Sequence, residues 1–375
     1  MRTPDPAPVA PPAAGRRRVA EMLRPVGASW WGMAAWLAVA LGAILAVTAA
    51  LGLAEWGSAV GLGFILTAVP SLPLTWRAAL STMVIRGCAV FIGAVVASLT
   101  TGHPAALGVT TVAAAVCGAS LARVGSTAGL AVVLIAVDLP PMPSGFDPGR
   151  VTAALAPYVI GALIVVIAWG AWFCCAETLR RARGEPPVAA AAATGRWEPG
   201  LHVLRVGIAV AAAVTLAGLL PDDLVGGHWL VTSVILTVQP TAGDTGMRLA
   251  QRLSGNTVGA LIAAVLLGAH PSVAVVAAMT VFLFTLAMAL RPVNYTWWAV
   301  TGPPVLLMIS EYPQLFPWYE GGVRLAMNLA GAAIVLVVVF GVPALMRIGS
   351  RGNADDFPER HPSDNVYKIQ SRRSR

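Results

Sequence analysis

Long apolar runs of helical length occupy most of the chain, and short segments containing glycine, proline or arginine separate them. A hydrocarbon core about 30 Å thick requires roughly 20 apolar residues in helical form. Only helices or closed barrels satisfy their backbone groups in lipid, and these Ala/Val/Leu runs lack the alternation of a barrel strand. The pattern therefore predicts twelve transmembrane helices, near residues 30–53, 56–74, 83–100, 104–121, 125–141, 151–174, 202–220, 228–241, 252–269, 271–290, 294–310 and 322–346.

Segments rich in charge, proline or alanine divide the chain into two six-helix halves. Residues 1–28 are expected to form a disordered cytoplasmic tail, with no cleavable signal peptide before the first apolar run. The first half spans residues 29–176 and the second spans residues 200–347, and a cytoplasmic linker over residues 177–199 joins them. Residues 348–375 form a basic tail, so both termini are expected in the cytoplasm.

The positions of the arginines test this topology independently, because short cytoplasmic loops are enriched in Lys and Arg. With the amino terminus inside, nearly every arginine falls on the inner side, and only Arg150 and Arg324 fall outside. A miscount by one span would destroy this alternation. We therefore expect a multi-pass protein of the bacterial inner (cytoplasmic) membrane, with the lipid bilayer as its main partner.

Composition agrees with a lipid environment and narrows the classes of function. Hydrophobic residues make up 57% of the chain and charged residues 11%, whereas soluble domains carry roughly 25% charged residues. The formal net charge is +8, but no basic stripe interleaved with aromatic residues indicates a nucleic-acid partner. Lys368 is the only lysine, so a GxxxxGK phosphate loop does not exist. No hydrolase triad, metal cluster or nucleotide fingerprint occurs either, so we expect neither an enzyme nor a cofactor.

The two halves repeat one another at a separation of about 166–173 residues. Since each half crosses the membrane an even number of times, the repeats are parallel, and a binding site is expected between them. The predicted fold is an all-α integral membrane protein built from two parallel six-helix repeats. The matched positions are Trp56 with Trp229, Pro70 with Pro240, Arg86 with Arg252, Gly93 with Gly259, His103 with His270, and Gly161 with Gly331.

An ordered motif of aromatic, proline, arginine and glycine positions runs through the second half. It comprises His228-Trp229-Leu230, Gln239-Pro240-Thr241, Thr245, Arg248, Arg252, Gly255, Gly259, Arg324, Asn328 and Gly331. Over roughly residues 200–340 this order resembles the fusaric acid resistance protein-like family, which includes aromatic acid exporters. The resemblance implies efflux of small organic anions, often aromatic carboxylates, without ATP hydrolysis in this chain. The first half shares the resemblance only through the internal repeat.

A proline interrupts the second span of each half, at Pro70 and at Pro240. Matched broken spans favour a transporter's binding site, because unwound backbone offers free N–H and C=O groups. Alternatively, each proline simply ends a helix at the cytoplasmic surface. The neighbouring Gln239 and Thr241 are candidates to hydrogen-bond a ligand, or they recapture the freed backbone groups.

Arginines are the strongest candidates for substrate binding. Arg86 and Arg252 lie inside apolar spans, where ionisable residues are costly and usually functional, although intramembrane partners are an equal alternative. Arg248 lies one helical turn before Arg252 and either binds a carboxylate or anchors the helix at the inner surface. Asn256, one turn after Arg252, completes this group of candidates on one helix.

Two residues near the outer side have competing interpretations. Arg324 either attracts anions that leave the pore or pairs with an acid, of which Glu320, Glu311 and Asp138 are candidates. Asp138 closes the fifth span and is either an interfacial acid or part of a proton relay.

Together these patterns favour an inner-membrane transporter, a secondary exporter or channel-like conduit for small organic anions. The alternative is a non-transporting membrane component of an envelope-biogenesis or assembly complex. A homo-oligomer or an accessory envelope protein is a possible partner in either case.

Overall fold

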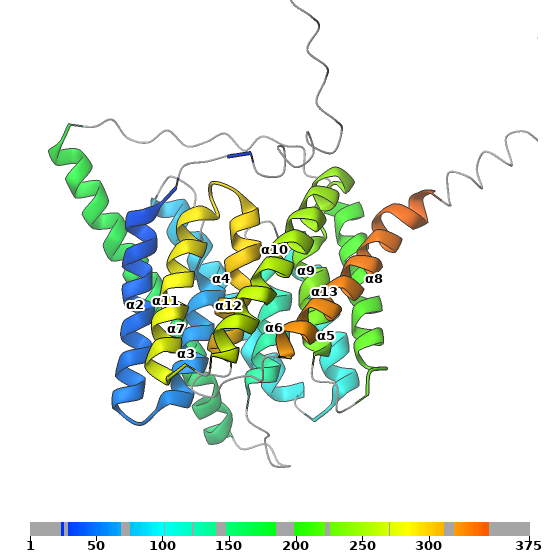
Figure 1. Ribbon diagram of the computed structural model, residues 1–375, viewed down its shortest axis with the longest axis horizontal. Helices are drawn as coiled ribbons and strands as arrows, with labels where there is room; N and C mark the ends of the chain where they lie inside the picture. Colours follow the sequence, from blue (N-terminus) through cyan, green and yellow to red (C-terminus); the bar gives the residue numbers. More distant parts are fainter. Residues whose placement is uncertain are drawn as a thin grey trace, which may run out of the picture.

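The computed structural model describes residues 24–25, 29–68, 76–100, 102–121, 124–139, 148–184, 199–221, 226–269, 271–310 and 319–344. Within these ranges every regular element is a helix (Figure 1). The first half contains α2 (Trp31–Ala50), α3 (Ala54–Thr67), α4 (Trp76–Thr100), α5 (Pro104–Ser120), α6 (Thr127–Asp138) and α7 (Pro148–Ala182). The second contains α8 (Pro199–Ala217), α9 (Gly227–Thr237), α10 (Ala242–Gly268), α11 (Val273–Leu290), α12 (Tyr295–Ser310) and α13 (Glu320–Leu336), which continues as the π-helical turn η1 (Val337–Gly341).

The twelve described helices follow the order of the twelve predicted segments, one helix to each segment. Among the described residues, α2, α4, α7, α8, α11 and α13 with its continuation are long and apolar enough to cross a membrane. Helices α5, α6 and α9 are apolar but shorter. The chain is therefore a multi-pass membrane protein, as its apolar runs predicted.

Helix α10 begins at Ala242, well before the apolar run that was expected to start it at residue 252. A polar cap explains the early start. The Thr241 hydroxyl accepts a hydrogen bond from the Asp244 backbone N–H at 3.0 Å and donates one to the Asp244 carboxylate at 2.7 Å. Such a side-chain acceptor satisfies an amide that has no partner in the first turn of a helix. The apolar pattern missed this polar helical segment, which carries Arg248.

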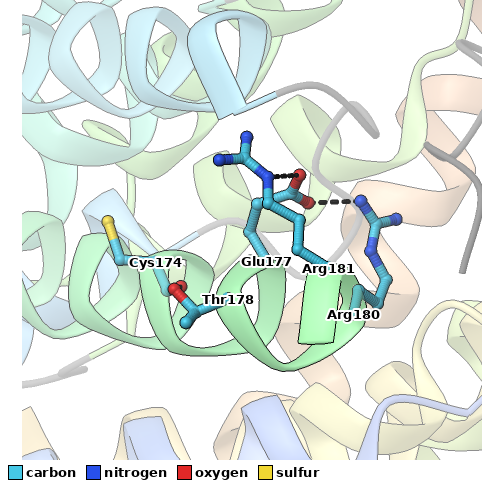
Figure 2. A network of polar contacts seen from close by, with 5 residues as sticks. All are labelled: Cys174, Glu177, Thr178, Arg180 and Arg181. Atoms are coloured by element: carbon cyan, nitrogen blue, oxygen red, sulfur yellow. Dashed lines mark hydrogen bonds and ion pairs between the residues drawn. The ribbon is translucent and has the colours of Figure 1, made fainter. Parts of the chain in front are cut away.

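Helix α7 continues to Ala182, into the range expected to form the linker. The apolar run ends near Cys174, but side-chain contacts maintain the next turns (Figure 2). Glu177 forms ion pairs with Arg180 and Arg181, three and four residues later. Pairs at this spacing lie on one helix face and contribute about 0.2–0.5 kcal/mol each. The linker was therefore predicted to start too early.

Close helix packing within each half depends on glycine. In the first half α3 packs on α7, and a Cβ atom at Gly161 of α7 would collide with the carbonyl oxygen of Val60 in α3. In the second half α10 packs on α12, where a Cβ atom at Gly259 would lie 2.5 Å from the carbonyl oxygen of Val300. Gly255, four residues before Gly259 on α10, also lies against α12, so the two glycines form a small-residue face for close helix packing.

Two groups of four helices join the halves. Helices α5, α6, α9 and α8 form a ring in which each helix packs on the next in this order and α8 packs on α5, and we call this ring seam 1. Helices α2, α3, α11 and α12 form a corresponding ring, seam 2, on the other side of the molecule (Figure 1). Large side chains fill seam 2, where Phe64 and Phe284 meet edge to face at 6.0 Å between ring centres, next to buried Met288 and Ile309.

Gly161→Ala should lower the Tm of the detergent-solubilised protein. The added methyl group would collide with backbone atoms of α3, and overpacking of this kind costs about 1–3 kcal/mol. Gly170→Ala, on the same helix, is the matched control, because no atom lies within 4 Å of the added Cβ. That change should raise the Tm, since alanine favours a helix over glycine by about 1 kcal/mol. Equal shifts for the two variants would contradict the close approach of α3 and α7.

Candidate functional site

Buried polar side chains line the interface between α10 and α13 in the second half. Arg252 and Arg324 are each 6% exposed, and Asn256 and Asn328 are also buried. Arg252 donates hydrogen bonds to the Asn328 side-chain oxygen at 3.2 Å and to the Tyr295 hydroxyl at 3.3 Å. The Asn256 amide donates to the same Asn328 oxygen at 2.9 Å. The sequence candidates Arg252 and Asn256 therefore belong to one network with Arg324, which is bonded to Asn328 through its backbone carbonyl.

This network has spare hydrogen-bonding capacity and very little space. The Arg252 Nε and the Asn256 Oδ1 are buried and have no hydrogen-bond partner among the described residues. They face a cavity of about 20 Å³, measured as space for the centre of a water molecule, which Trp229 and Trp298 also line. A volume of this size holds about one water. In this conformation the cavity is too small for an organic anion.

Arg324 interacts with a backbone carbonyl and an indole ring. Its Nη1 donates to the Pro303 carbonyl oxygen at 2.8 Å, and its guanidinium lies 3.5 Å from the centre of the Trp229 ring. The expected pairing with Asp138 is wrong, because that carboxylate accepts hydrogen bonds elsewhere. The side chains of Glu311 and Glu320, the other expected partners, lie outside the described residues.

Asp138 is held within the first half by two hydroxyl groups. The Ser58 hydroxyl of α3 donates to it at 2.9 Å, and the Tyr158 hydroxyl of α7 donates at 2.6 Å. Tyr158 is 1% exposed, so the carboxylate lies against the interior of the half rather than projecting into the interface. Asp138 lines neither the cavity beside Arg252 nor the cavity beside Arg86 that is described below.

Two further arginines, Arg248 and Arg291, lie near the amino-terminal end of α10. The Arg248 guanidinium lies 3.5 Å from the centre of the Tyr295 ring, and Arg291 lies 4.5 Å from the centre of the Trp298 ring. Burial lowers the pKa of Arg291, which lies in the turn after α11, to about 10, and Arg86 and Arg248 act on it as neighbouring positive charges. Arg291 was not among the sequence candidates, because an arginine in a short inner loop is typical of membrane topology.

None of these arginines is neutralised by an acid among the described residues. Ion pairs there involve Glu177, which lies at the end of α7. Aromatic rings, amides or carbonyl groups contact Arg248, Arg252 and Arg324 instead. Arg86 has no hydrogen-bond partner among the described residues. Because buried cations normally pair with anions, this cluster is electrostatically incomplete.

A larger cavity lies in seam 1 and brings together three sequence candidates. Arg86, Gln239 and Pro240 line it, with Ser126 and His202. Its volume is about 240 Å³, measured as space for the centres of water molecules. It lies at the end of the seam where α8 begins, which is the upper end in Figure 1. The Arg86 Nε is buried, and no hydrogen bond joins this guanidinium to a described residue. The arrangement offers an unused guanidinium to a cavity between the two halves.

Polar groups in the turn between α9 and α10 have two roles. Some form hydrogen bonds with the backbone, and others line the seam 1 cavity. The Thr245 hydroxyl accepts a hydrogen bond from the Gln239 backbone N–H at 3.0 Å and donates to the Thr241 carbonyl at 2.8 Å. Thr241 caps α10, so these two threonines recapture backbone groups, which was one of the two expected roles. Pro240 lies in the turn that ends α9, and its carbonyl accepts a hydrogen bond from Arg205 at 3.3 Å. Its repeat mate Pro70 lies outside the described residues.

His202 was missed by the sequence analysis. It is 7% exposed on α8 and forms a hydrogen bond with the backbone of Gln239, which fixes the wall of the seam 1 cavity. The available signal was a polar residue one turn into an otherwise apolar span. That signal is weak alone, because a single histidine in an apolar run is compatible with many packing environments.

The two repeat-mate arginines lie at equal depth along their helices. Arg86 is the eleventh residue of α4, and Arg252 is the eleventh residue of α10. At 1.5 Å per residue each lies about 15 Å from the start of its helix, which is half of a hydrocarbon core about 30 Å thick. The structure nevertheless assigns them to different cavities, Arg86 to seam 1 and Arg252 to the interior of the second half.

Comparison with known proteins bears on the second half. No curated protein and no solved structure matches the chain. Residues 206–338, which include α9 to α13 and most of α8, match the family model described as fusaric acid resistance protein-like. This match confirms the resemblance to that family that was drawn from the ordered motif of the second half.

Proposed function

We propose that this protein is an inner-membrane exporter of small organic anions, among them aromatic carboxylates, acting as a secondary carrier or a channel-like conduit. The observation that carries the proposal is the Arg86 guanidinium, which has no hydrogen-bond partner among the described residues and faces a cavity of about 240 Å³ between the halves. The match to the fusaric acid resistance protein-like family supports a role in efflux. Both termini lie in the cytoplasm on this proposal.

Electrostatics favour an anion as the transported species. Among the described residues no acid pairs with Arg86, Arg248, Arg252 or Arg324, and burial of an unpaired cation such as Arg252 or Arg324 costs several kcal/mol. A carboxylate that enters the Arg86 cavity would accept paired N–H donors from a planar guanidinium. A cation would meet repulsion from the same groups, and a neutral solute would gain nothing from them.

The volumes of the two cavities indicate that the Arg86 cavity binds the anion and that the residues around the Arg252 cavity have a supporting role. The Arg86 cavity can admit a benzoate-sized anion, because it is about twelve times larger than the Arg252 cavity (240 against 20 Å³). Arg252, Asn256 and Arg324 then contribute positive potential beside the route, with Arg248 at its inner end. Gln239 and Pro240 complete the binding wall, and Thr241 supports the turn that holds them.

The two-repeat layout with twelve crossings is part of this proposal, and matched packing supports it. Helix α4 packs on α6 as α10 packs on α12, and the repeat mates Gly93 and Gly259 lie at these two contacts. Likewise Gly161 lies against α3 as Gly331 lies against α9. The first helix of each half, α2 or α8, also packs on the fourth helix of the other half, α11 or α5.

Accumulation of labelled solutes tests the proposal directly. Cells that overproduce the protein should retain less benzoate and 4-hydroxybenzoate than cells that lack it, whereas retention of benzamide should not change. Benzamide is the matched control because it keeps the ring and size of benzoate but has no charge. Unchanged retention of every acid in a broad panel would overturn the proposal. Failure to transport in liposomes, together with a stably co-purified partner, would favour the assembly-component alternative.

A further inference from the structure

We infer that the anions cross the membrane through seam 1 alone, between α5, α6, α8 and α9, and that seam 2 is closed. This inference rests on the proposed function and adds the route, its gate and a requirement on the substrate. It follows from a second cavity in seam 1, from the short interval between the two cavities, and from the different filling of seam 2.

The second cavity lies at the opposite end of the same four helices. It has a volume of about 250 Å³ as space for water centres, and its lining includes Thr111 of α5, Val137 of α6, Val214 of α8 and His228 of α9. The Arg86 cavity touches the other ends of these helices. Because the upper cavity lies where α8 begins and the lower one where α8 ends, the two face opposite sides of the membrane.

A thin apolar plug separates the two cavities. Thr111 lines the lower cavity and Ala115, one turn later on α5, lines the upper one, which is a separation of about 6 Å along the helix. On α8 the corresponding residues are Val214 and Val206, about 12 Å apart. The plug between them includes three side chains that are 0% exposed, Val210 and Ala213 of α8 and Val234 of α9.

The thin, apolar plug acts as the gate of this route. At Gly129 of α6 an added Cβ would lie 3.2 Å from Ala115 Cβ of α5 and 3.0 Å from Ile235 Cδ1 of α9, so α6 packs directly on α5 and the Ile235 side chain fills the gap to α9. A dry constriction of this kind blocks ions until it widens and admits water or solute.

Seam 2 does not offer the same route. Phe64, Phe284 and Ile309 occupy its interior, and an added Cβ at Gly61 of α3 would lie 2.7 Å from Ile309 Cδ1. Thr280 of α11, which follows Thr111 by 169 residues and so falls within the repeat spacing, is 1% exposed and hydrogen-bonded to its own helix. Two phenylalanine rings therefore fill the interior of seam 2, whereas aliphatic side chains form the plug of seam 1.

The chemistry of the route defines the class of substrate. Its upper cavity offers a guanidinium for a carboxylate, whereas the lower cavity is lined mainly by Leu, Val and Ala side chains with His228 and Thr111. A monoanion with an apolar body fits both cavities in turn. A small polyanion without an apolar part, such as citrate, would lose its charge partner in the lower cavity and gain no apolar contact there.

Cysteine accessibility tests the route without depending on transport. The four native cysteines are exposed, so the background carries Cys88→Ser, Cys117→Ser, Cys174→Ser and Cys175→Ser. In this background Ser126→Cys probes the upper cavity, Thr111→Cys the lower cavity, and Thr280→Cys the matched position of seam 2. A charged, membrane-impermeant methanethiosulfonate should label Ser126→Cys only from the cytoplasmic side and Thr111→Cys only from the opposite side. Thr280→Cys should stay unlabelled, and benzoate should slow the labelling of Ser126→Cys severalfold, whereas citrate should not.

Several results would overturn the inference. Rapid labelling of Thr280→Cys would show that seam 2 is open, and absence of labelling at both seam 1 positions would show that the cavities are closed to solvent. Val234→Ala, which thins the plug, should increase benzoate flux at least twofold; unchanged flux in a protein with normal Tm would contradict the gate. If the wild type exports benzoate but the labelling pattern fails, only the route is wrong. If the labelling pattern holds and the wild type exports no acid, the proposed function is wrong while the accessible seam remains.

Discussion

Export of benzoate should fall at least tenfold when Arg86 is replaced by glutamine. Hydrogen bonds to charged groups contribute about 1.5–3 kcal/mol, and the guanidinium of Arg86 lines the seam 1 cavity without a hydrogen-bond partner among the described residues. A loss of about 1.4 kcal/mol is a tenfold change, so removal of this one charge is sufficient for the expected effect. The measurement is the initial efflux rate from preloaded cells, normalised to the amount of protein in the membrane.

Arg77→Gln is the matched control for this experiment. Arg77 lies on the same helix but at its exposed beginning, so the same change of charge should leave efflux within about twofold of the wild type. Arg86→Lys should give an intermediate rate, because lysine keeps the charge but loses the planar, paired donors. Equal rates for wild type and Arg86→Gln, at equal expression, would remove Arg86 from the binding site.

Arg252→Met should make the protein more stable and less active. Burial of a cation without an acidic partner costs several kcal/mol, and methionine fills a similar volume without that cost. The Asn328 oxygen keeps its hydrogen bond from Asn256, so the change leaves that acceptor satisfied. The change also removes positive potential beside the route. If this weakens the interaction with the anion by roughly 1–1.4 kcal/mol, benzoate efflux should drop about five- to tenfold.

The opposite directions of these two effects make the Arg252 experiment decisive. A residue retained only for structure should lower the Tm when it is removed, whereas a residue retained for function at a cost in stability should raise it. Arg252→Lys provides the control, since it keeps the charge and should neither raise the Tm nor abolish efflux. A lower Tm with unchanged efflux for Arg252→Met would make Arg252 a structural residue.

The number and order of the helices could be predicted because the cost of exposing backbone and polar groups to lipid is a local property of sequence. Each apolar run is long enough to be recognised without knowledge of its neighbours. Helix ends were less predictable, since they depend on short polar contacts. Thr241 extends α10 toward the amino terminus, and Glu177 extends α7 toward the linker, although both residues lie outside the apolar runs.

The candidate site was predicted only in part, because its geometry depends on contacts between distant segments. Position inside an apolar span identified Arg86 and Arg252 as unusual, and the structure buries Arg252 and brings Arg86 to a cavity. Sequence spacing did not show that the two arginines face different cavities. It also favoured an acid as the partner of Arg324, whereas the fold supplies Trp229, nearly a hundred residues away in the chain.

The unequal filling of the two seams has a consequence for stoichiometry. In a pair of identical six-helix subunits related by a twofold axis, both junctions would be the same, and any side chain that plugged one would plug the other. Covalent fusion of two diverged copies removes that constraint. One junction, seam 2, can then be rigidly packed while the other, seam 1, stays permeable. Each polypeptide should then carry a single conduit, and a mixture of active and inactive chains should lose flux in simple proportion to the inactive fraction.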